Sequence, residues 1–228
     1  MDKICFTALD GYKLAQRTSP AAQAIQKPLN AIVPAKGMNE IVRVLSGSEK
    51  DAYFNVEDKR FIVSVGKTQV IVNLLEGTFI NYSVLIPGED EIKTKVEIER
   101  EKLLISVERA SLITDETRNA LIKMDIDENN LHLAGKSDKG EVSDDIYLEK
   151  EGENIKIAFN ARYFVEILRN IADEKIIIQF KDNNAPCLIT PVDNDSFKYL
   201  VMPVRYLSLI HIFTPAQCTL PLYSMRSR

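Results

Sequence analysis

Two segments of the chain share one spacing of apolar and charged positions. VPAKGMNEIVRVL starts at Val33 and FNARYFVEILRNI starts at Phe159, and they align without a gap at an offset of 126 residues (161 − 35). In each segment the apolar residues recur at helical spacing, which predicts an amphipathic helix. The predicted buried stripes are Met38, Ile41, Val42 and Leu45 in the first helix and Phe164, Ile167, Leu168 and Ile171 in the second.

The same alignment repeats a pair of basic residues on the face opposite each stripe. Lys36 and Arg43 form the first pair, and Arg162 and Arg169 form the second. Seven residues of helix separate the two cations of a pair by about 10 Å along the axis. One interpretation is an ordinary solvated face, because Glu40 and Glu166 follow Lys36 and Arg162 by four residues and can pair with them. The repetition favours a shared surface that contacts phosphates without reading bases, with the two helices as neighbours along one concave lining.

Apolar runs separated by turn residues predict strands over most of the remaining chain. After the first helix they form a meander, and two hairpins and a further helix, from about Glu99 to Ile113, precede the second quoted helix. This helix would bury Leu103, Leu104, Val107 and Leu112. The predicted strands are 52–56, 60–65 and 68–75, a hairpin of 121–127 with 131–135, a hairpin of 145–150 with 154–159, and then 175–180, 185–191 and 197–204. The prediction is an α+β fold.

The order strand, basic helix and several strands occurs twice, which indicates repeated domains rather than a solenoid. The first copy is shorter, so we expect residues 1–85 to be part of a domain whose opening half is missing. We expect a linker and the next domain's first strand over 86–95, a complete domain over 93–206, and a non-native tail over 207–228.

Composition restricts the classes of function. The 228 residues are 45% hydrophobic and carry a net charge of −4, which is typical of a soluble globular protein. The apolar runs are far shorter than the roughly 18 to 20 residues of a membrane helix, and no secretory signal is present, so we expect a cytoplasmic protein and no membrane partner. Cys5, Cys187 and Cys218 are too widely spaced for a zinc motif and are expected to be reduced thiols. With this charge, nucleic acid can bind only where cations gather on one face.

Candidates for catalysis are few. Carboxylates are paired at Asp125, Asp127 and Glu128 and again at Asp144 and Asp145, where they could serve metal or acid–base chemistry, although such residues are common at turns. His132 and His211 are the two histidines, and no Ser, Cys or His pattern indicates a nucleophile. We therefore expect no catalytic residue, no metal and no cofactor, with a metal-dependent enzyme using Asp125 or Asp127 as the alternative.

Two short stretches could form a surface for peptides. LDGYKLA (9–15) contains a tight Asp-Gly turn, and YLVMPVR (199–205) is an apolar run that Pro203 stops. They could be simply a turn and a buried strand. Alternatively, their apolar groups, rimmed by Tyr12, Lys13 and Arg205, could bind a partner peptide, with or without DNA binding elsewhere.

Four motifs together resemble the bacterial sliding clamp family, the beta subunit of DNA polymerase III. DGYKLA is similar to the family's TDG(H/Y)RLA, IVPAKG to VPxKG, TFINYSVLIP to (K/R)FPDYxxVLP, and YLVMPVR to YVVMPMR. They occur in the family's order between Ile4 and Arg205. The resemblance implies a DNA-clamp fold with antiparallel sheets outside and paired helices on the inner face. Two protomers would close into a ring that encircles double-stranded DNA without reading its sequence.

The resemblance also implies partners. The alpha subunit of DNA polymerase III and the clamp loader would bind through peptide motifs, and the full-length protein would be a homodimer. Since the first domain and half of the second are absent, we expect that this chain alone does not close a ring.

The resemblance also implies roles for individual residues. DNA-facing candidates are Lys36, Arg43, Arg162 and Arg169, then Lys102 and Arg109. The implied peptide pocket is Gly11, Tyr12, Lys13, Leu14, Ile80, Val84, Leu85, Pro186, Leu200, Met202, Pro203, Val204 and Arg205. Implied dimer contacts are Leu112, Ile113, Glu141, Asp144 and Asp145. Ile80 and Val84 depart from the family, which usually has proline and a basic residue there.

Overall fold

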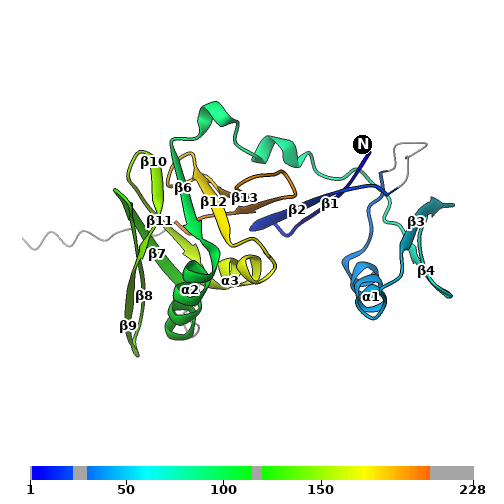
Figure 1. Ribbon diagram of the computed structural model, residues 1–228, viewed down its shortest axis with the longest axis horizontal. Coiled ribbons are helices and arrows are strands. Elements are labelled where there is room, and N and C mark those ends of the chain that lie inside the picture. The colour runs from blue at the N-terminus through cyan, green and yellow to red at the C-terminus, as the bar shows by residue number, and fades with distance from the viewer. Residues whose placement is uncertain (1, 23–29, 115–119, 206–228) are drawn as a thin grey trace, which may run out of the picture.

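The structure, a computed structural model, describes residues 2–22, 30–114 and 120–205. Within these ranges, helices and strands follow one another as antiparallel sheets with helices packed on them, so the predicted α+β fold is confirmed (Figure 1). The predicted tail, with His211 and Cys218, lies outside the described residues. Among the described residues, no helix is both long and apolar enough to cross a membrane.

A seven-stranded antiparallel sheet joins the two ends of the described chain. The hairpin of β1 (Lys3–Leu9) and β2 (Lys13–Pro20) pairs with β14 (Phe197–Val201) from the far end of the chain, and Leu14 is in register with Leu200. Side chains alternate across this sheet, so Leu14 and Ala15 face opposite sides. In spatial order the strands are β1 (Lys3–Leu9), β2 (Lys13–Pro20), β14 (Phe197–Val201), β13 (Cys187–Pro191), β12 (Lys175–Phe180), β6 (Thr94–Glu99) and β10 (Glu149–Gly152).

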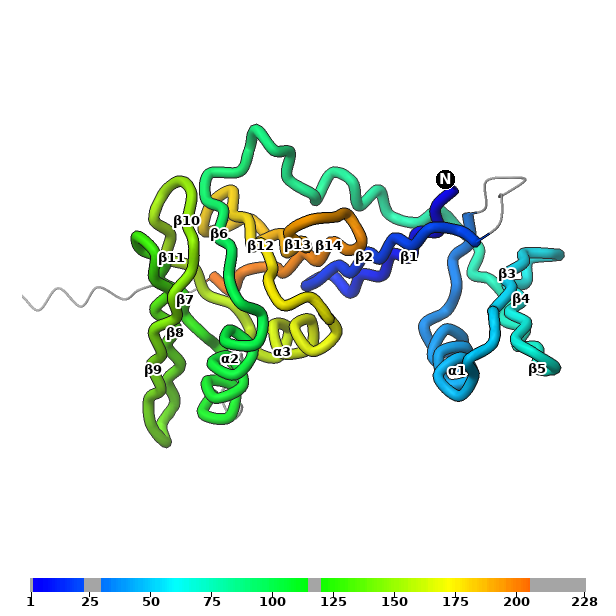
Figure 2. The backbone as a smooth tube through the Cα atoms, in the orientation of Figure 1, coloured from blue at the N-terminus to red at the C-terminus, as the bar shows by residue number. Residues whose placement is uncertain are grey.

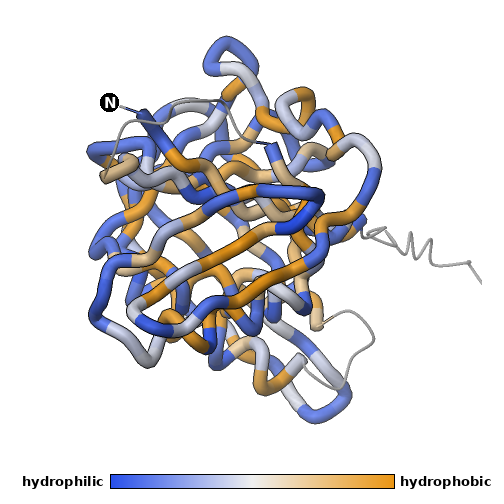
Figure 3. The backbone as a smooth tube through the Cα atoms, turned by 90° about the vertical axis from the view of Figure 1, so that its right-hand side faces the viewer, coloured by the Kyte–Doolittle hydropathy of each residue, from blue (hydrophilic) through white to orange (hydrophobic). Residues whose placement is uncertain are grey.

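Two smaller antiparallel sheets complete the described fold, and apolar and polar residues interleave along the strands (Figure 3). The first is β11 (Ile155–Asn160), β7 (Leu121–Asp127), β8 (Asn130–Ser137) and β9 (Gly140–Tyr147), in that spatial order. The second is β3 (Ala52–Glu57), β4 (Arg60–Val65) and β5 (Thr68–Asn73), which matches the predicted meander.

The three α-helices of the described residues are each followed by a three-stranded meander, so the repeat seen in the sequence is a structural repeat. They are α1 (Ala35–Ser46), α2 (Arg100–Thr114) and α3 (Ala161–Arg169). Two short 3-10 turns, η1 (Tyr82–Leu85) and η2 (Glu89–Glu91), lie in the connection between β5 and β6. In Figures 1 and 2 the three helices lie on one side of the seven-stranded sheet, and this connection runs along the other.

The main apolar core lies around α2 and α3, which pack against each other between the seven-stranded and four-stranded sheets. Phe159 and Phe164 are both fully buried there, with ring centroids 4.9 Å apart. Cys187 is also fully buried, and burial raises the pKa of its thiol far above the ordinary value. A smaller core joins α1 to the three-stranded sheet through Ile41, Phe61 and Val63.

The predicted stripes are correct for α3 but not for the other two helices. Phe164, Ile167, Leu168 and Ile171 are all buried. On α1, Val42 is 54% exposed although the matching Leu168 is fully buried, because α3 packs on α2 whereas α1 stands apart from that pair (Figure 1). The expectation that the two quoted helices are packed neighbours is therefore wrong, although both lie on the same side of the molecule.

One residue of the stripe predicted for α2 is also misplaced. Leu112 is 80% exposed, whereas Ser106, Ala110 and Thr114 are buried with Leu103 and Val107. Ala110 and Thr114 lie close to Gly135 of β8, where larger side chains would not fit. The helix therefore presents small residues to the sheet, which an apolar stripe does not reveal.

The predicted hairpin of 145–150 with 154–159 is wrong. The strand β9 ends at Tyr147, and after Leu148 the chain continues as β10, which pairs with β6 in the seven-stranded sheet. The following strand, β11, pairs with β7 instead. Leu148 is 1% exposed and belongs to the core between the two sheets, so the chain turns from one sheet into the other at this residue.

Candidate functional site

The cations of α1 and α3 lie on exposed helix faces opposite the buried residues. Helix α1 begins after Pro34, and α3 begins after Asn160, whose side chain accepts a hydrogen bond of 2.9 Å from the backbone N–H of Arg162. Lys36, Arg43, Arg162 and Arg169 are all exposed. The structure thus places all four predicted cations on outward helix surfaces.

The acidic neighbours of these cations pair differently from the sequence prediction. Glu40 pairs with Arg43, at 2.9 Å, and not with Lys36. The carboxylate of Glu166 pairs with Lys13 of β2. Arg169 of α3 pairs with Glu108 of α2, at 2.8 Å, so that this ion pair joins the two packed helices.

The two candidate cations of α2 are also held by carboxylates. Lys102 lies 2.7 Å from Glu99 at the start of the helix, and Arg109 lies 2.8 Å from Oδ2 of Asp144 on β9. The Arg109 contact is an ion pair that does not have hydrogen-bond geometry, since that oxygen has no hydrogen-bond partner. Arg109 is therefore turned toward the four-stranded sheet.

Each helix nevertheless carries a small excess of positive charge. In each of α1, α2 and α3 the basic residues exceed the acidic ones by one, whereas the whole chain has a net charge of −4. All three helices lie on the same side of the seven-stranded sheet (Figure 1). This surface, made by α1, α2 and α3, is called the helix face below.

The opposite side of the seven-stranded sheet carries a second feature, called the outer apolar cluster. Leu14, Leu188 and Leu200 are buried together across β2, β13 and β14. Partly buried residues pack on them, among which Tyr82 also accepts a hydrogen bond of 3.0 Å from Gln16. These residues are Leu9, Tyr82 and Ile86.

The predicted pocket residues fall into several groups around this cluster. Leu14 and Leu200 are at its centre, and Met202 donates a backbone hydrogen bond of 2.8 Å to the carbonyl of Tyr12, so the two motifs do meet. Gly11 has a φ of +86°, as the tight turn requires. The remaining members lie at the margin: Pro186, Pro203 and Val204 are half-buried, and Ile80, Val84, Leu85, Met202 and Arg205 are exposed.

Tyr12 and Lys13 are predicted pocket residues whose side chains contact α3 instead, where the ring of Tyr12 stacks on that of Tyr163. Lys13 is in register with Val201, a residue of the main core, and its side chain pairs with Glu166 on the helix side of the sheet. The sequence prediction also missed Tyr82 and Ile86. Both lie in the stretch TFINYSVLIP, and its apolar residues were the available signal.

The predicted dimer contacts lie along one margin of the fold. Leu112 is exposed and Ile113 is half-buried near the end of α2, and β9 is an edge strand of the four-stranded sheet. Glu141 and Asp145 are exposed on β9, while Asp144 is 17% exposed and paired with Arg109. Hydrogen bonds from Asn130 and then His132 lower the pKa of the Asp145 carboxyl below its ordinary value.

The residues of the enzyme alternative are engaged in other contacts. Asp125 pairs with Lys156, and Asp127 accepts a hydrogen bond from Asn154. Among the described residues, no group of three or more His, Cys, Asp or Glu side chains is arranged to hold a metal ion.

The structure does bring a serine, a histidine and an aspartate together, which the sequence did not indicate. On the outward face of β8 and β9, His132 lies 3.1 Å from Asp145 and 3.3 Å from Ser143. The three side chains are exposed. None of them lines either of the two cavities described below.

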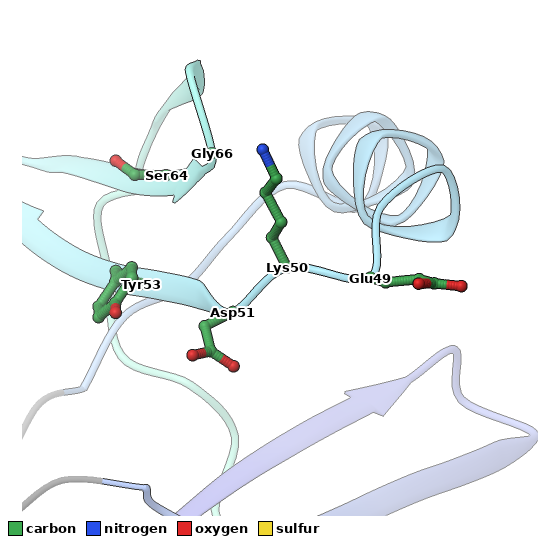
Figure 4. Close-up of a pocket in the computed structure, with 6 residues that line it drawn as sticks. All are labelled: Glu49, Lys50, Asp51, Tyr53, Ser64 and Gly66. Carbon is green, nitrogen blue, oxygen red and sulfur yellow. The ribbon is translucent and has the colours of Figure 1, made fainter.

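One cavity of about 440 Å³ lies beside Lys50 in the N-terminal part. Figure 4 shows Lys50 extending toward Gly66, with the carboxylates of Glu49 and Asp51 directed away from it; Tyr53 and Ser64 complete the lining. A second, of about 550 Å³, lies between the β1–β2 hairpin and α3 and is lined by residues that include Lys13, Arg17 and Glu166. The second cavity borders the helix face.

Comparisons with known proteins cover both parts of the chain. A family model described as DNA polymerase III beta subunit, central domain, matches residues 1–81, and one described as the C-terminal domain of the same subunit matches residues 84–205. The beta sliding clamp of Staphylococcus epidermidis is 29% identical over 204 residues, which is 89% of this chain and 53% of the relative. The beta sliding clamp of Synechococcus elongatus is 30% identical over 209 residues, which is 90% and 55%.

The solved structures give the same result for the fold. The crystal structure of the DNA polymerase III beta subunit from Thermotoga maritima has a TM-score of 0.82 at 29% identity, and the match covers 90% of this chain and 55% of that one. The chain therefore spans about half the length of the relatives that it matches.

Proposed function

The chain belongs to the DNA polymerase III beta subunit family, and we propose that it forms part of a replication sliding clamp. In this proposal the helix face contacts the phosphates of duplex DNA without reading its sequence, and the outer apolar cluster with its exposed margin binds peptides of the polymerase and of the clamp loader. Neither activity needs a catalytic group, and the clamp family is a non-catalytic processivity factor. Residues 1–85 are then part of a central domain, and residues 93–206 are the C-terminal domain.

One observation carries the DNA part of this proposal. In an acidic chain, all three helices have an excess of basic residues and lie on one side of the same sheet. Local positive potential attracts a polyanion even when the net charge is negative. Contacts to phosphates through exposed cations are individually weak, which suits a protein that must slide along DNA.

Removing the four cations tests the DNA part. We expect that changing Lys36, Arg43, Arg162 and Arg169 to Gln lowers affinity for a short fluorescent duplex about 10- to 100-fold at 0.1 M salt and reduces the slope of log K against log salt by about 1 to 2. The reduction stays below the full value for four phosphate contacts because Glu40 and Glu108 already offset part of the charge. Fluorescence anisotropy at several salt concentrations measures both quantities.

A matched control removes the same number of positive charges from parts of the chain outside the helix face. Four lysines outside the three helices each pair with an acidic residue: Lys59, Lys156, Lys175 and Lys181. Their joint replacement with Gln should leave most of the affinity and slope in place. Equal losses in the two quadruple variants would contradict a DNA-binding helix face.

The peptide part rests on apolar side chains left exposed around a buried centre. Val84 is 76% exposed and Met202 is 40% exposed beside the outer apolar cluster. Replacing either with Asp should weaken binding of a peptide rich in Gln, Leu and Phe about tenfold, because a charge would have to be desolvated at the contact. Isothermal titration calorimetry measures the change.

The control for the peptide measurement is Ile71→Asp, a change of an exposed apolar residue on the three-stranded sheet. It should leave the peptide affinity unchanged. If Ile71→Asp weakens binding as much as Met202→Asp does, the peptide does not bind at the outer apolar cluster.

The family also supplies a proposal for assembly. Two full-length chains would associate through the exposed Leu112, the neighbouring Ile113 and the edge strand β9 with its acidic Glu141, Asp144 and Asp145. The open edge of β9 supports this proposal, since edge strands pair with further strands.

A further inference from the structure

Lys13 occupies an unusual position among the cations of this fold. Its side chain is 21% exposed, and every other Lys or Arg in an ion pair of the described residues is at least 41% exposed. Its Nζ lies 5.1 Å above the ring centroid of Tyr163 on α3 and 3.7 Å from Asp10. The ammonium group therefore has a fixed place against α3.

The turn that carries Lys13 is itself anchored to α3. Asp10 accepts hydrogen bonds of 3.0 Å from the backbone N–H groups of Tyr12 and Lys13, which closes the turn. The ring of Tyr12 stacks on that of Tyr163, with centroids 5.9 Å apart and planes inclined by 29°. Both contacts position the Lys13 side chain for the carboxylate of Glu166.

Glu166 is the acidic residue of α3, and it is in the middle of the cationic side of that helix. It follows Arg162 by four residues and precedes Arg169 by three, so it is a neighbour of both on the helix surface. Its side chain is 60% exposed. An uncompensated carboxylate at this position would repel phosphates and would attract the guanidinium of Arg162 away from them.

We propose that Lys13 is a positioning residue for DNA on the helix face: by pairing with Glu166, it neutralises the negative charge between Arg162 and Arg169. This inference rests on the proposed DNA-binding function. Lys13 then serves the helix side of the sheet, whereas its neighbour Leu14 belongs to the outer apolar cluster. Adjacent residues of one strand thus serve two different surfaces.

A double-mutant cycle tests the role of Lys13. In the full 228-residue chain, Lys13→Gln should weaken binding of a short duplex about 5- to 10-fold at 0.1 M salt, the effect of about one charge. Glu166→Gln alone should change the affinity less than twofold, because Lys13 already neutralises this carboxylate in the parent chain. In the Glu166→Gln background, Lys13→Gln should change the affinity less than twofold, because the carboxylate between Arg162 and Arg169 is no longer present.

Other outcomes decide against the proposal. If Lys13→Gln weakens binding equally with and without Glu166, Lys13 contacts DNA directly and the positioning role is wrong. Lys13→Arg keeps the charge and should retain at least half of the parent affinity; a loss as large as that of Lys13→Gln would indicate a packing role instead. If the parent chain binds no duplex, both this inference and the proposed function fail, whereas parent binding without any effect of Lys13 refutes only the inference.

Discussion

Replacing Gly152 with alanine should lower the free energy of unfolding by about 4 kcal/mol, from overpacking and backbone strain acting together. A Cβ at this position would lie 1.9 Å from the carbonyl oxygen of Lys93 and 2.9 Å from its carbonyl carbon. Both are backbone atoms, so the clash cannot be relieved by rotating a side chain. The φ of +94° adds strain for any residue with a Cβ.

The clash would fall where β10 joins the seven-stranded sheet. Gly152 is in register with Thr94 of β6. The Lys93 carbonyl that the added Cβ would contact accepts a hydrogen bond of 3.1 Å from the backbone N–H of Glu153. Moving Lys93 away would break that bond and disturb the start of β6. Urea denaturation followed by circular dichroism measures the loss of stability.

Gly11→Ala is the matched comparison for Gly152→Ala. Gly11 has a similar φ of +86°, but nothing lies within 4 Å of its added Cβ. The expected loss is therefore the backbone strain alone, about 1 kcal/mol. Equal losses in the two variants would show that the β10–β6 corner is not packed as described.

Replacing Leu168 with alanine should lower the free energy of unfolding by about 3 kcal/mol, because the side chain is fully buried between α3, α2 and the sheets. The matching position on α1 is Val42, at the same offset of 126 residues (168 − 42). Val42 is 54% exposed, so Val42→Ala should cost less than about 1 kcal/mol.

The comparison of Leu168 and Val42 isolates the effect of the partner helix. Both residues follow a repeated basic position by six residues and lie on amphipathic helices, and only α3 has α2 packed against it. The same denaturation experiment measures both variants. If Val42→Ala costs as much as Leu168→Ala, another helix or another chain covers α1 in solution.

The hydrophobic pattern predicted the helices and most strands because those elements bury one face and expose the other. The α3 stripe, the meander of β3, β4 and β5, and the hairpin of β7 and β8 follow this rule. The helices at Lys36 and Arg162 could be identified for the same reason, since their cations lie opposite the buried residues.

The failures arise where pairing depends on distant parts of the chain. Residues 145–150 alternate like one strand, yet the chain leaves one sheet for another at Leu148, and alternation does not specify which strand is the neighbour. Likewise, a helical stripe cannot reveal that α2 packs small residues such as Ala110 against Gly135.

Charge pairing was the least predictable part of the candidate site. Helical spacing suggested that Glu166 pairs with Arg162, but the hairpin of β1 and β2 brings Lys13 to Glu166 from 153 residues away. Only the register between β2 and β14 places these residues together. The resemblance to a family placed Lys13 near the peptide pocket by position along the chain, without indicating which side of the strand its side chain occupies.

The pairing of β2 with β14 has a mechanical consequence. Five residue pairs, from Lys13 with Val201 to Arg17 with Phe197, join the first segment of the chain to the last strand described. Cleavage of the backbone between β5 and β6 would therefore not separate the two fragments, because the β2–β14 pairing in the shared sheet would still hold them together. Bending at that connection is restrained as well, because such a bend would have to distort the paired strands β2 and β14.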